Sequence, residues 1–239
     1  MAGILLEIVA STVEDCIAAK SGGADRIELC AAISTGGLTP SLGTLLEAKK
    51  RVHIPVMAMV RPRAGGFCYS EKDFAVMRRD AALLIEHGAD GIVFGILHAD
   101  GSVDTKRCAR MVEISGDKQT VFHRAFDVAA DPLRALDELI DVGITRVLTS
   151  GRKETAYEGR ELIQRLIQQA GRRIEVLAGG GVRAHNVLEL IEATGCTQVH
   201  MTAFAERTDA SNSSYEQVDR EIVQRMKNVL SRVNHRRRA

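Results

Sequence analysis

An internal repeat constrains the fold of this chain more than any other feature. Four segments begin with a glycine and continue into a short apolar run, namely G23-ADRIELC, G88-ADGIVFGI, G143-ITRVLTSG and G195-CTQVHMTA. Each glycine stands where a preceding helix would end in a left-handed residue, and each apolar run is typical of a buried strand. The repeat therefore predicts several copies of a helix–strand unit.

Further apolar runs complete the pattern. Strands are expected at about 4–9, 25–30, 55–61, 90–96, 119–126, 144–150, 173–179 and 197–202. Helical patterns cover about 13–21, 41–51, 71–87, 104–114, 132–141, 155–170, 185–193 and 214–232. Eight strands alternating with eight helices predict one α/β domain over residues 1–239, a single (β/α)8 TIM barrel. A doubly wound open sheet is the alternative, but no GxGxxG motif follows the first strand.

Composition limits the class of ligand. The 32 basic residues nearly balance the 31 acidic ones, and the chain has six Phe, three Tyr and no Trp, so we expect no nucleic-acid partner. No apolar run is long enough to span a membrane, and the N-terminus lacks the pattern of a signal peptide. Five cysteines without a CxxC pair suggest reduced thiols and a cytoplasmic location. A small molecule or metal ion is the expected ligand. A homo-oligomer stays open, because the outward helix faces carry Ile, Leu and Val.

Aligning the four repeats predicts which side chains face the barrel axis, because side chains alternate along a strand. The fifth residue after each glycine should face inward; these are Glu28, Val93, Leu148 and His200. The seventh should as well; these are Cys30, Gly95, Ser150 and Thr202. The residues of this second set are all small and lie at the C-terminal ends of the strands. Small residues there predict a cavity, at the face where barrel enzymes place their active sites.

The segment VFHRAFD (121–127) ends the fifth strand in three polar residues. The same alternation points His123 inward and Arg124 away. Two carboxylates and two imidazoles converging in a cleft could do acid–base chemistry or hold a divalent metal ion. Candidate catalytic residues are His123, Glu28, Glu7 and Asp127. The alternative is that such groups form buried ion pairs, such as Arg26 with Glu175, that only stabilise the barrel.

Two further segments suggest anion binding. Arg61 and Arg63 flank a proline before a flexible loop, and guanidinium groups bind phosphate or carboxylate in a bidentate manner. They could instead pair with carboxylates at neighbouring strand ends. The glycines of 179–181 follow the seventh strand, where many barrels bind phosphate, although a tight turn explains them equally well. Candidate substrate- or anion-binding residues are Arg61, Arg63, Arg124, Ser150, Gly179, Gly180, Gly181, His200 and Thr202.

Two of the five cysteines are placed near the predicted cavity. Cys30 lies at the end of the second strand, and Cys68 lies in the loop after the neighbouring third strand. Two thiolates from adjacent loops could bind Cu(I), a soft ion that accepts few sulfur ligands. A small buried residue is the competing explanation for Cys30.

Several long motifs resemble the CutC family. They are RIELCA (26–31), GGLTPS (36–41), RPR followed by FCYS (61–70), GADGIVFG (88–95), TVFHRAFD (120–127), RVLTSG (146–151) and AGGGV (178–182). The resemblance is collinear from about residue 5 to 203. It implies a TIM barrel and cytoplasmic copper homeostasis, with Cu(I) bound through the cysteine that Cys30 matches. It also implies a shared polar cluster at the barrel mouth, formed by Glu7, Glu28, Arg61, His123, Arg124, Asp127 and His200.

Two positions depart from the family pattern. Ala64-Gly65-Gly66-Phe67 stands where Gly-Gly-Asp-Phe is expected, so a loop carboxylate is missing, and Thr202 stands where Ser is common. Two hypotheses follow. One is a copper homeostasis protein that binds Cu(I) through Cys30 and Cys68. The other is an enzyme that acts by acid–base chemistry on a small anionic or phosphorylated metabolite.

Overall fold

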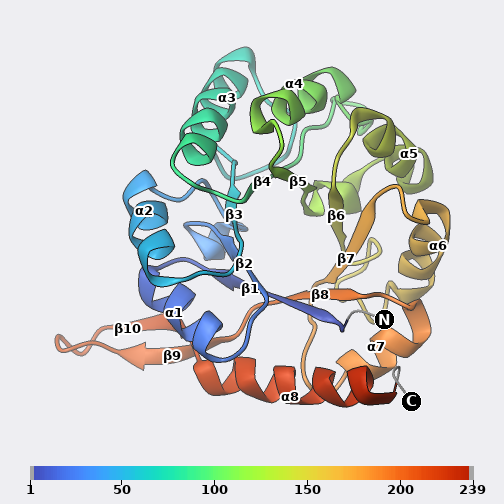
Figure 1. Cartoon of the computed structure of the whole chain (residues 1–239). Helices are drawn as coiled ribbons and strands as arrows, with labels where there is room; N and C mark the ends of the chain where they lie inside the picture. Colours follow the sequence, from blue (N-terminus) through green and yellow to red (C-terminus); the bar gives the residue numbers. More distant parts are fainter. Residues whose placement is uncertain (1–2, 237–239) are drawn as a thin grey trace.

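The computed structural model describes residues 3–236 and forms a closed barrel of eight parallel strands (Figure 1). The strands are β1 (Leu5–Ala10), β2 (Arg26–Leu29), β3 (Val56–Met59), β4 (Gly91–Phe94), β5 (Gln119–Phe122), β6 (Arg146–Thr149), β7 (Glu175–Gly179) and β8 (Gln198–Met201). Each strand pairs with the next along the chain, and β8 pairs with β1, which closes the barrel. The predicted (β/α)8 fold is confirmed.

Eight helices surround the strands (Figure 1). They are α1 (Val13–Ser21), α2 (Leu42–Arg51), α3 (Glu71–Glu86), α4 (Thr105–Ser115), α5 (Pro132–Val142), α6 (Arg160–Ala170), α7 (Val187–Thr194) and α8 (Arg220–Arg236). The repeat glycines that follow α1, α3, α5 and α7 all have positive φ, between 74° and 97°. The predicted left-handed helix ends are therefore confirmed.

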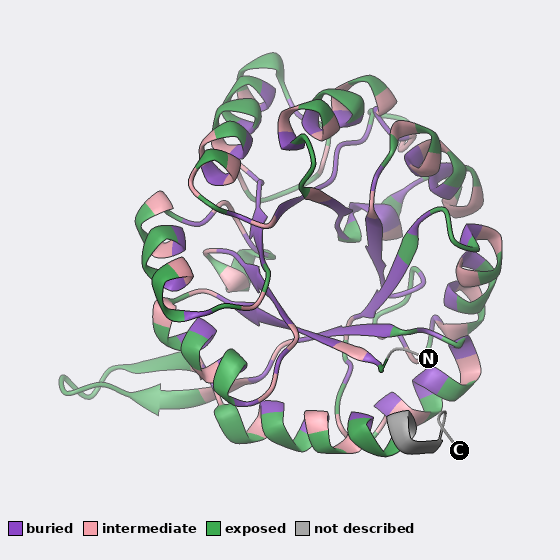
Figure 2. Ribbon diagram, in the orientation of Figure 1, coloured by how far each residue is buried: buried purple, intermediate pink, exposed green. Residues whose placement is uncertain are grey.

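Most of the barrel strands are buried (Figure 2). They separate two apolar regions. The larger lies between the strands and the helices and contains Ile27, Ile92, Val147 and Val199. The smaller lies inside the barrel and contains Val9, Cys30, Met57, Met59, Val93, Val121, Leu148 and Leu177. The predicted alternation of inward and outward side chains is thus correct.

Ion pairs of two buried arginines occupy the N-terminal part of the barrel, one with a buried and one with an exposed glutamate. Arg26 contacts Glu7, and Arg146 lies 2.5 Å from Glu175. The Oε1 atom of Gln198 accepts from both guanidinium groups at 2.9 Å. The expected pairing of Arg26 with Glu175 is wrong, because β2 and β7 are not neighbours, whereas each observed pair joins register partners on adjacent strands.

The predicted helix over 214–232 is wrong at its start. Residues Phe204–Thr208 (β9) and Ser214–Val218 (β10) form an antiparallel hairpin that projects beyond α1, and α8 begins only at Arg220 (Figure 1). Asp209 holds the turn by accepting the N–H groups of Ser211 and Ser213. Within residues 3–236, no helix is both long and apolar enough to cross a bilayer.

Candidate functional site

A cavity of about 210 Å³ lies at the C-terminal ends of the strands. Its polar lining consists of Glu28, Cys30, His123, Arg124, His200 and Thr202. Its remaining lining consists of Val9, Ile33, Gly36, Gly37, Met59, Phe67 and Leu148. The structure therefore places six of the predicted site residues around one space, on the face where barrel proteins bind their ligands.

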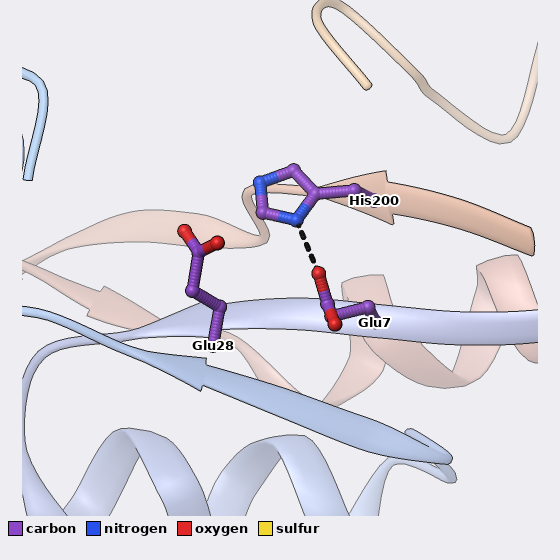
Figure 3. A group of neighbouring side chains, drawn as sticks. All are labelled: Glu7, Glu28 and His200. Carbon is purple, nitrogen blue, oxygen red and sulfur yellow. Dashed lines mark hydrogen bonds and ion pairs between the residues drawn. The ribbon is translucent and has the colours of Figure 1, made fainter. Parts of the chain in front are cut away.

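Three buried groups form the polar floor of this region (Figure 3). Glu7, Glu28 and His200 each bring one ligand-type atom within 4.8 Å of the other two. His200 Nδ1 lies 2.8 Å from Glu7 Oε1, and Arg26 contacts the other oxygen of Glu7. Glu28 Oε2 is buried and has no hydrogen-bond partner within residues 3–236. Glu7 is thus fully paired, whereas Glu28 is left free to interact with a ligand.

The surroundings shift the pKa values of these groups in opposite directions. Burial raises the pKa of Glu28 to about 7, and the nearby Glu7 carboxylate adds to the effect. Burial also disfavours charge on Glu7, but Arg26 and His200 lower its pKa to about 2. Burial would lower the pKa of His200, but Glu28 and Glu7 together raise it above its ordinary value. One floor carboxyl is therefore permanently charged, and the other can exchange a proton near neutral pH.

His123 presents a neutral imidazole to the cavity. Its Nδ1 accepts the backbone N–H of Ala125 at 3.1 Å, which assigns the ring proton to Nε2. Burial, together with the Arg61 guanidinium, lowers the pKa of His123 to about 3. The Nε2 atom is buried without a partner in the described chain, and Phe67 packs on the ring at 4.9 Å. His123 is therefore a fixed hydrogen-bond donor for a ligand.

Gly95 makes room for this imidazole. A Cβ atom at position 95 would lie 2.6 Å from both Cε1 and Nδ1 of His123. The small residue predicted at the end of β4 is thus part of the site, because it lets the ring sit against the strand.

The segment after β5 differs from the predicted strand. The chain turns into a 3-10 helix, η2 (Arg124–Val128), so both His123 and Arg124 line the cavity, although alternation had pointed Arg124 away. Arg124 Nε lies 2.7 Å from Asp127 Oδ2, and its Nη2 donates to Ser150 Oγ at 2.8 Å. Its Nη1 makes no hydrogen bond within residues 3–236 and lies 3.6 Å from where a Cβ of Gly180 would be.

Asp127 and Ser150 hold the loop together. Asp127 accepts hydrogen bonds from Thr149 Oγ1, the Ser150 and Arg152 N–H groups and Ser150 Oγ, in addition to its ion pair with Arg124. Ser150 Oγ also lies 2.6 Å from the carbonyl of Lys153. The structure gives neither residue a place in the cavity lining, since their polar atoms are occupied by this loop.

Arg61 and Arg63 do not have the open geometry expected of anion-binding residues. Arg61 donates to the carbonyls of Thr35, Gly37 and Gly65, which joins the loop after β2 to the loop after β3. Arg63 contacts Asp73 and donates to backbone carbonyls of its own loop. The sequence did not predict that Arg61 joins two loops, because its acceptors are backbone carbonyls, which every residue carries and no motif marks.

The glycines after β7 lie against other parts of the chain. A Cβ atom on Gly179 would lie 2.6 Å from Leu148 Cδ1, and one on Gly181 would lie 2.8 Å from the side chain of Thr155. Gly180, with a φ of 105°, packs beside Ser150. None of the three lines the cavity, because the loop after β6 lies against this turn. The geometry favours the tight-turn interpretation.

The two candidate copper ligands, Cys30 and Cys68, line two different spaces. Cys30 is buried and lines the cavity with Met59. Cys68 is exposed and lines a separate groove of about 910 Å³ beside α3 and α4, while its neighbour Phe67 faces the cavity. The predicted two-thiol site is therefore not formed, because successive side chains of the loop after β3 point in opposite directions. Cys30 and Met59 remain as two sulfur-bearing side chains that line the same cavity.

A divalent metal ion fits the floor less well. Glu7 is already neutralised by Arg26 and hydrogen-bonded to His200, so two of three prospective ligands are engaged with one another. Arg26 and Arg146 add positive charge next to this position. The floor is better suited to proton transfer than to a divalent ion.

Sequence reasoning missed the residues that form the apolar wall. Ile33 and Phe67 come from loops, where alternation gives no direction. Met59 could have been found, because it alternates with the outward Ala58 on β3. The motifs at 36–41 and 61–70 contribute Gly36, Gly37 and Phe67 to the wall of the cavity.

The fold and the cavity together define the class of protein: a (β/α)8 barrel with a small cavity of mixed polar and apolar lining at the C-terminal ends of its strands. The family model described as CutC family matches residues 4–205, and the chain belongs to this family. Its relatives include the family protein CutC of Treponema denticola, 50% identical over 90% of this chain and 87% of that protein.

Other relatives agree. The human protein named copper homeostasis protein cutC homolog is 46% identical, over 86% of this chain and 75% of that protein. The crystal structure of CutC from Streptococcus agalactiae superposes with a TM-score of 0.79 at 34% identity, covering 82% of this chain and 97% of that one. Thiamine phosphate pyrophosphorylase from Pyrococcus furiosus, at 14% identity and a TM-score of 0.62, shares the fold.

Proposed function

We propose that this protein is an enzyme that moves a proton on a small anionic metabolite, a carboxylate or a phosphate ester. One observation carries the proposal: Glu28 and His123 line the same cavity, and each holds a buried polar atom, Oε2 and Nε2, with no partner in residues 3–236. Buried polar atoms without partners cost stability, so a site that keeps two of them is suited to a ligand that pairs with both.

The two groups differ in the way that acid–base catalysis requires. His123 stays neutral and donates through Nε2–H to an oxygen of the substrate. Glu28 takes a proton from the neighbouring carbon or hydroxyl group, and the negative charge that develops lies on the oxygen held by His123. Reversal of the step returns the proton from Glu28. Two groups whose environments separate their pKa values are the usual arrangement for such chemistry.

Deuterium exchange tests this function. The protein is incubated in D2O with a panel of small oxo acids, hydroxy acids and sugar phosphates, and C–H exchange is followed by NMR. We expect exchange in at least one compound and a loss of about 100-fold or more in Glu28→Gln. Glu189→Gln, at an exposed carboxylate of α7, is the matched control and should exchange like the wild type. Exchange that Glu28→Gln leaves unchanged, or none above buffer, contradicts the proposal.

Cu(I) binding in the cytoplasm is the second candidate function. It is supported by Cys30 and Met59 on one cavity and by relatives that are named copper homeostasis proteins. Burial, with the nearby Glu28 carboxylate, raises the pKa of the Cys30 thiol, so Cu(I) must displace its proton. Anaerobic titration against a competing chelator should give one equivalent, lost in Cys30→Ser and retained in Cys68→Ser. Equal binding by all three proteins contradicts a site at Cys30.

A further inference from the structure

We infer that the cavity binds a monocarboxylate of the 2-oxo or 2-hydroxy acid class with a short apolar chain, and not a phosphate ester. The inference rests on the proposed function, since it names the substrate class of the same cavity. It is carried by the size of the cavity, by the distribution of its apolar and polar walls, and by the single guanidinium group that is open to it.

Size limits the ligand to a small molecule. A volume of about 210 Å³ corresponds to about seven water molecules at about 30 Å³ each, below the about 300–1,000 Å³ typical of drug-sized ligands. Two loops border the space, contribute Ile33 and Phe67 to its lining, and are joined by Arg61. A ligand of about seven to ten non-hydrogen atoms is therefore the expected occupant.

The walls divide the ligand into a polar and an apolar part. Val9, Ile33, Met59, Phe67 and Leu148 form the apolar side. On the same cavity, Nε2 of His123, whose ring packs against Phe67, needs an acceptor, and Oε2 of Glu28 needs a polar partner. A carbonyl or hydroxyl oxygen next to a short alkyl chain satisfies both sides, whereas a polyhydroxylated sugar leaves its hydroxyl groups against apolar side chains.

Charge selects a monoanion. Among the described residues, Arg124 is the one arginine that lines the cavity, and two of its three nitrogens are held by Asp127 and Ser150. Arg61, although adjacent, donates to three backbone carbonyls. The glycine turn 179–181, which would be the usual phosphate cradle, lies against Thr155 outside the cavity. One guanidinium group that is already paired, on the same cavity as a neutral His123, suits one carboxylate better than a phosphate dianion.

Ligand-observed NMR and calorimetry with 2-oxobutyrate, 2-hydroxybutyrate, inorganic phosphate and glycerol 3-phosphate test this assignment. The wild type should bind both organic acids saturably and neither phosphate compound. Arg124→Gln should weaken acid binding by about tenfold or more. Arg165→Gln is the control, because Arg165 is exposed on α6, does not line the cavity and should leave binding unchanged.

A chain-length series gives a readout that needs no variant. From 2-oxopropanoate upward, each added CH2 group should tighten binding by about fourfold until the cavity is full, after which affinity should fall. Tighter binding of glycerol 3-phosphate than of any oxo acid overturns the inference, and so does a flat series.

Failure of this inference can be told apart from failure of the proposed function. Acid binding that depends on Arg124, without Glu28-dependent exchange, supports the inferred ligand class and contradicts the proposed enzymatic function. Glu28-dependent exchange in a sugar phosphate, without acid binding, supports the proposed enzymatic function and contradicts the inferred ligand class.

Discussion

Replacing Glu28 with Gln should stabilise the protein at neutral and alkaline pH. Glu28 is 4% exposed, and its Oε2 has no partner in the described chain. Burial raises its pKa from 4.5 to about 7. The folded state therefore binds the proton more tightly than the unfolded state, and stability falls as pH rises from about 4.5 to about 7.

The size of the effect follows from the pKa values. One pKa unit corresponds to about 1.4 kcal/mol, so moving the pKa from 4.5 to about 7 costs about 3 kcal/mol once both states are ionised. Below about pH 4.5 both states are protonated, and the cost disappears. A glutamine has nearly the same shape and carries no charge. The variant should thus match the wild type in acid and exceed it by about 3 kcal/mol at about pH 8.

Urea unfolding at about pH 4.5 and about pH 8 measures this difference, with Glu189→Gln as the exposed control. A stabilisation that appears only at the higher pH, accompanied by loss of proton exchange, would show that the site trades stability for function. A Glu28→Gln protein that is no more stable at pH 8, or equally stabilised at both pH values, would refute the argument that the carboxylate is buried without compensation.

Three further outcomes are expected. Arg26→Met leaves Glu7 buried without its cation and should lower the free energy of unfolding at pH 7 by about 3–5 kcal/mol, measured in urea; a loss below about 1 kcal/mol would contradict the pairing. Gly95→Ala forces a Cβ to within 2.6 Å of the His123 ring and should cost about 1–3 kcal/mol and displace that ring, as seen by its NMR shifts; unchanged shifts would contradict the contact. Arg61→Gln removes three guanidinium-to-carbonyl bonds and should speed amide hydrogen exchange in the loops after β2 and β3 while sparing the strands; equal protection would contradict its role.

Predictions made from strand alternation were correct where the chain is regular. Glu28, Cys30 and His200 face the barrel interior as the repeat requires, because a closed parallel barrel leaves each side chain only two directions. Arg124 was placed on the wrong side, because the chain leaves the strand after Phe122 and the 3-10 turn changes the direction of the next residue. Strand alternation gives no direction for Cys68, because this residue lies in the loop between β3 and α3.

The roles of polar residues in loops could not be read from their types. Asp127 and Arg61 resemble catalytic and anion-binding residues in sequence, yet both oxygens of Asp127 and both terminal nitrogens of Arg61 bond to other parts of the chain, which leaves only Arg61 Nε unpaired among the described residues. Whether a charged group serves a ligand or the fold depends on how many of its hydrogen-bond positions the chain itself fills. That number is a property of the assembled loops.

Sequence alone predicted the barrel, its closure by eight strands, and the side chains that face its axis, since glycine-ended helices and alternating strands are local patterns and no GxGxxG motif favoured the open sheet. Only the tertiary structure decided which polar groups remain free. It paired Glu7 with Arg26 and left Glu28 Oε2 and His123 Nε2 without a hydrogen-bond partner among the described residues, because that outcome depends on strand register and loop contacts between residues far apart along the chain.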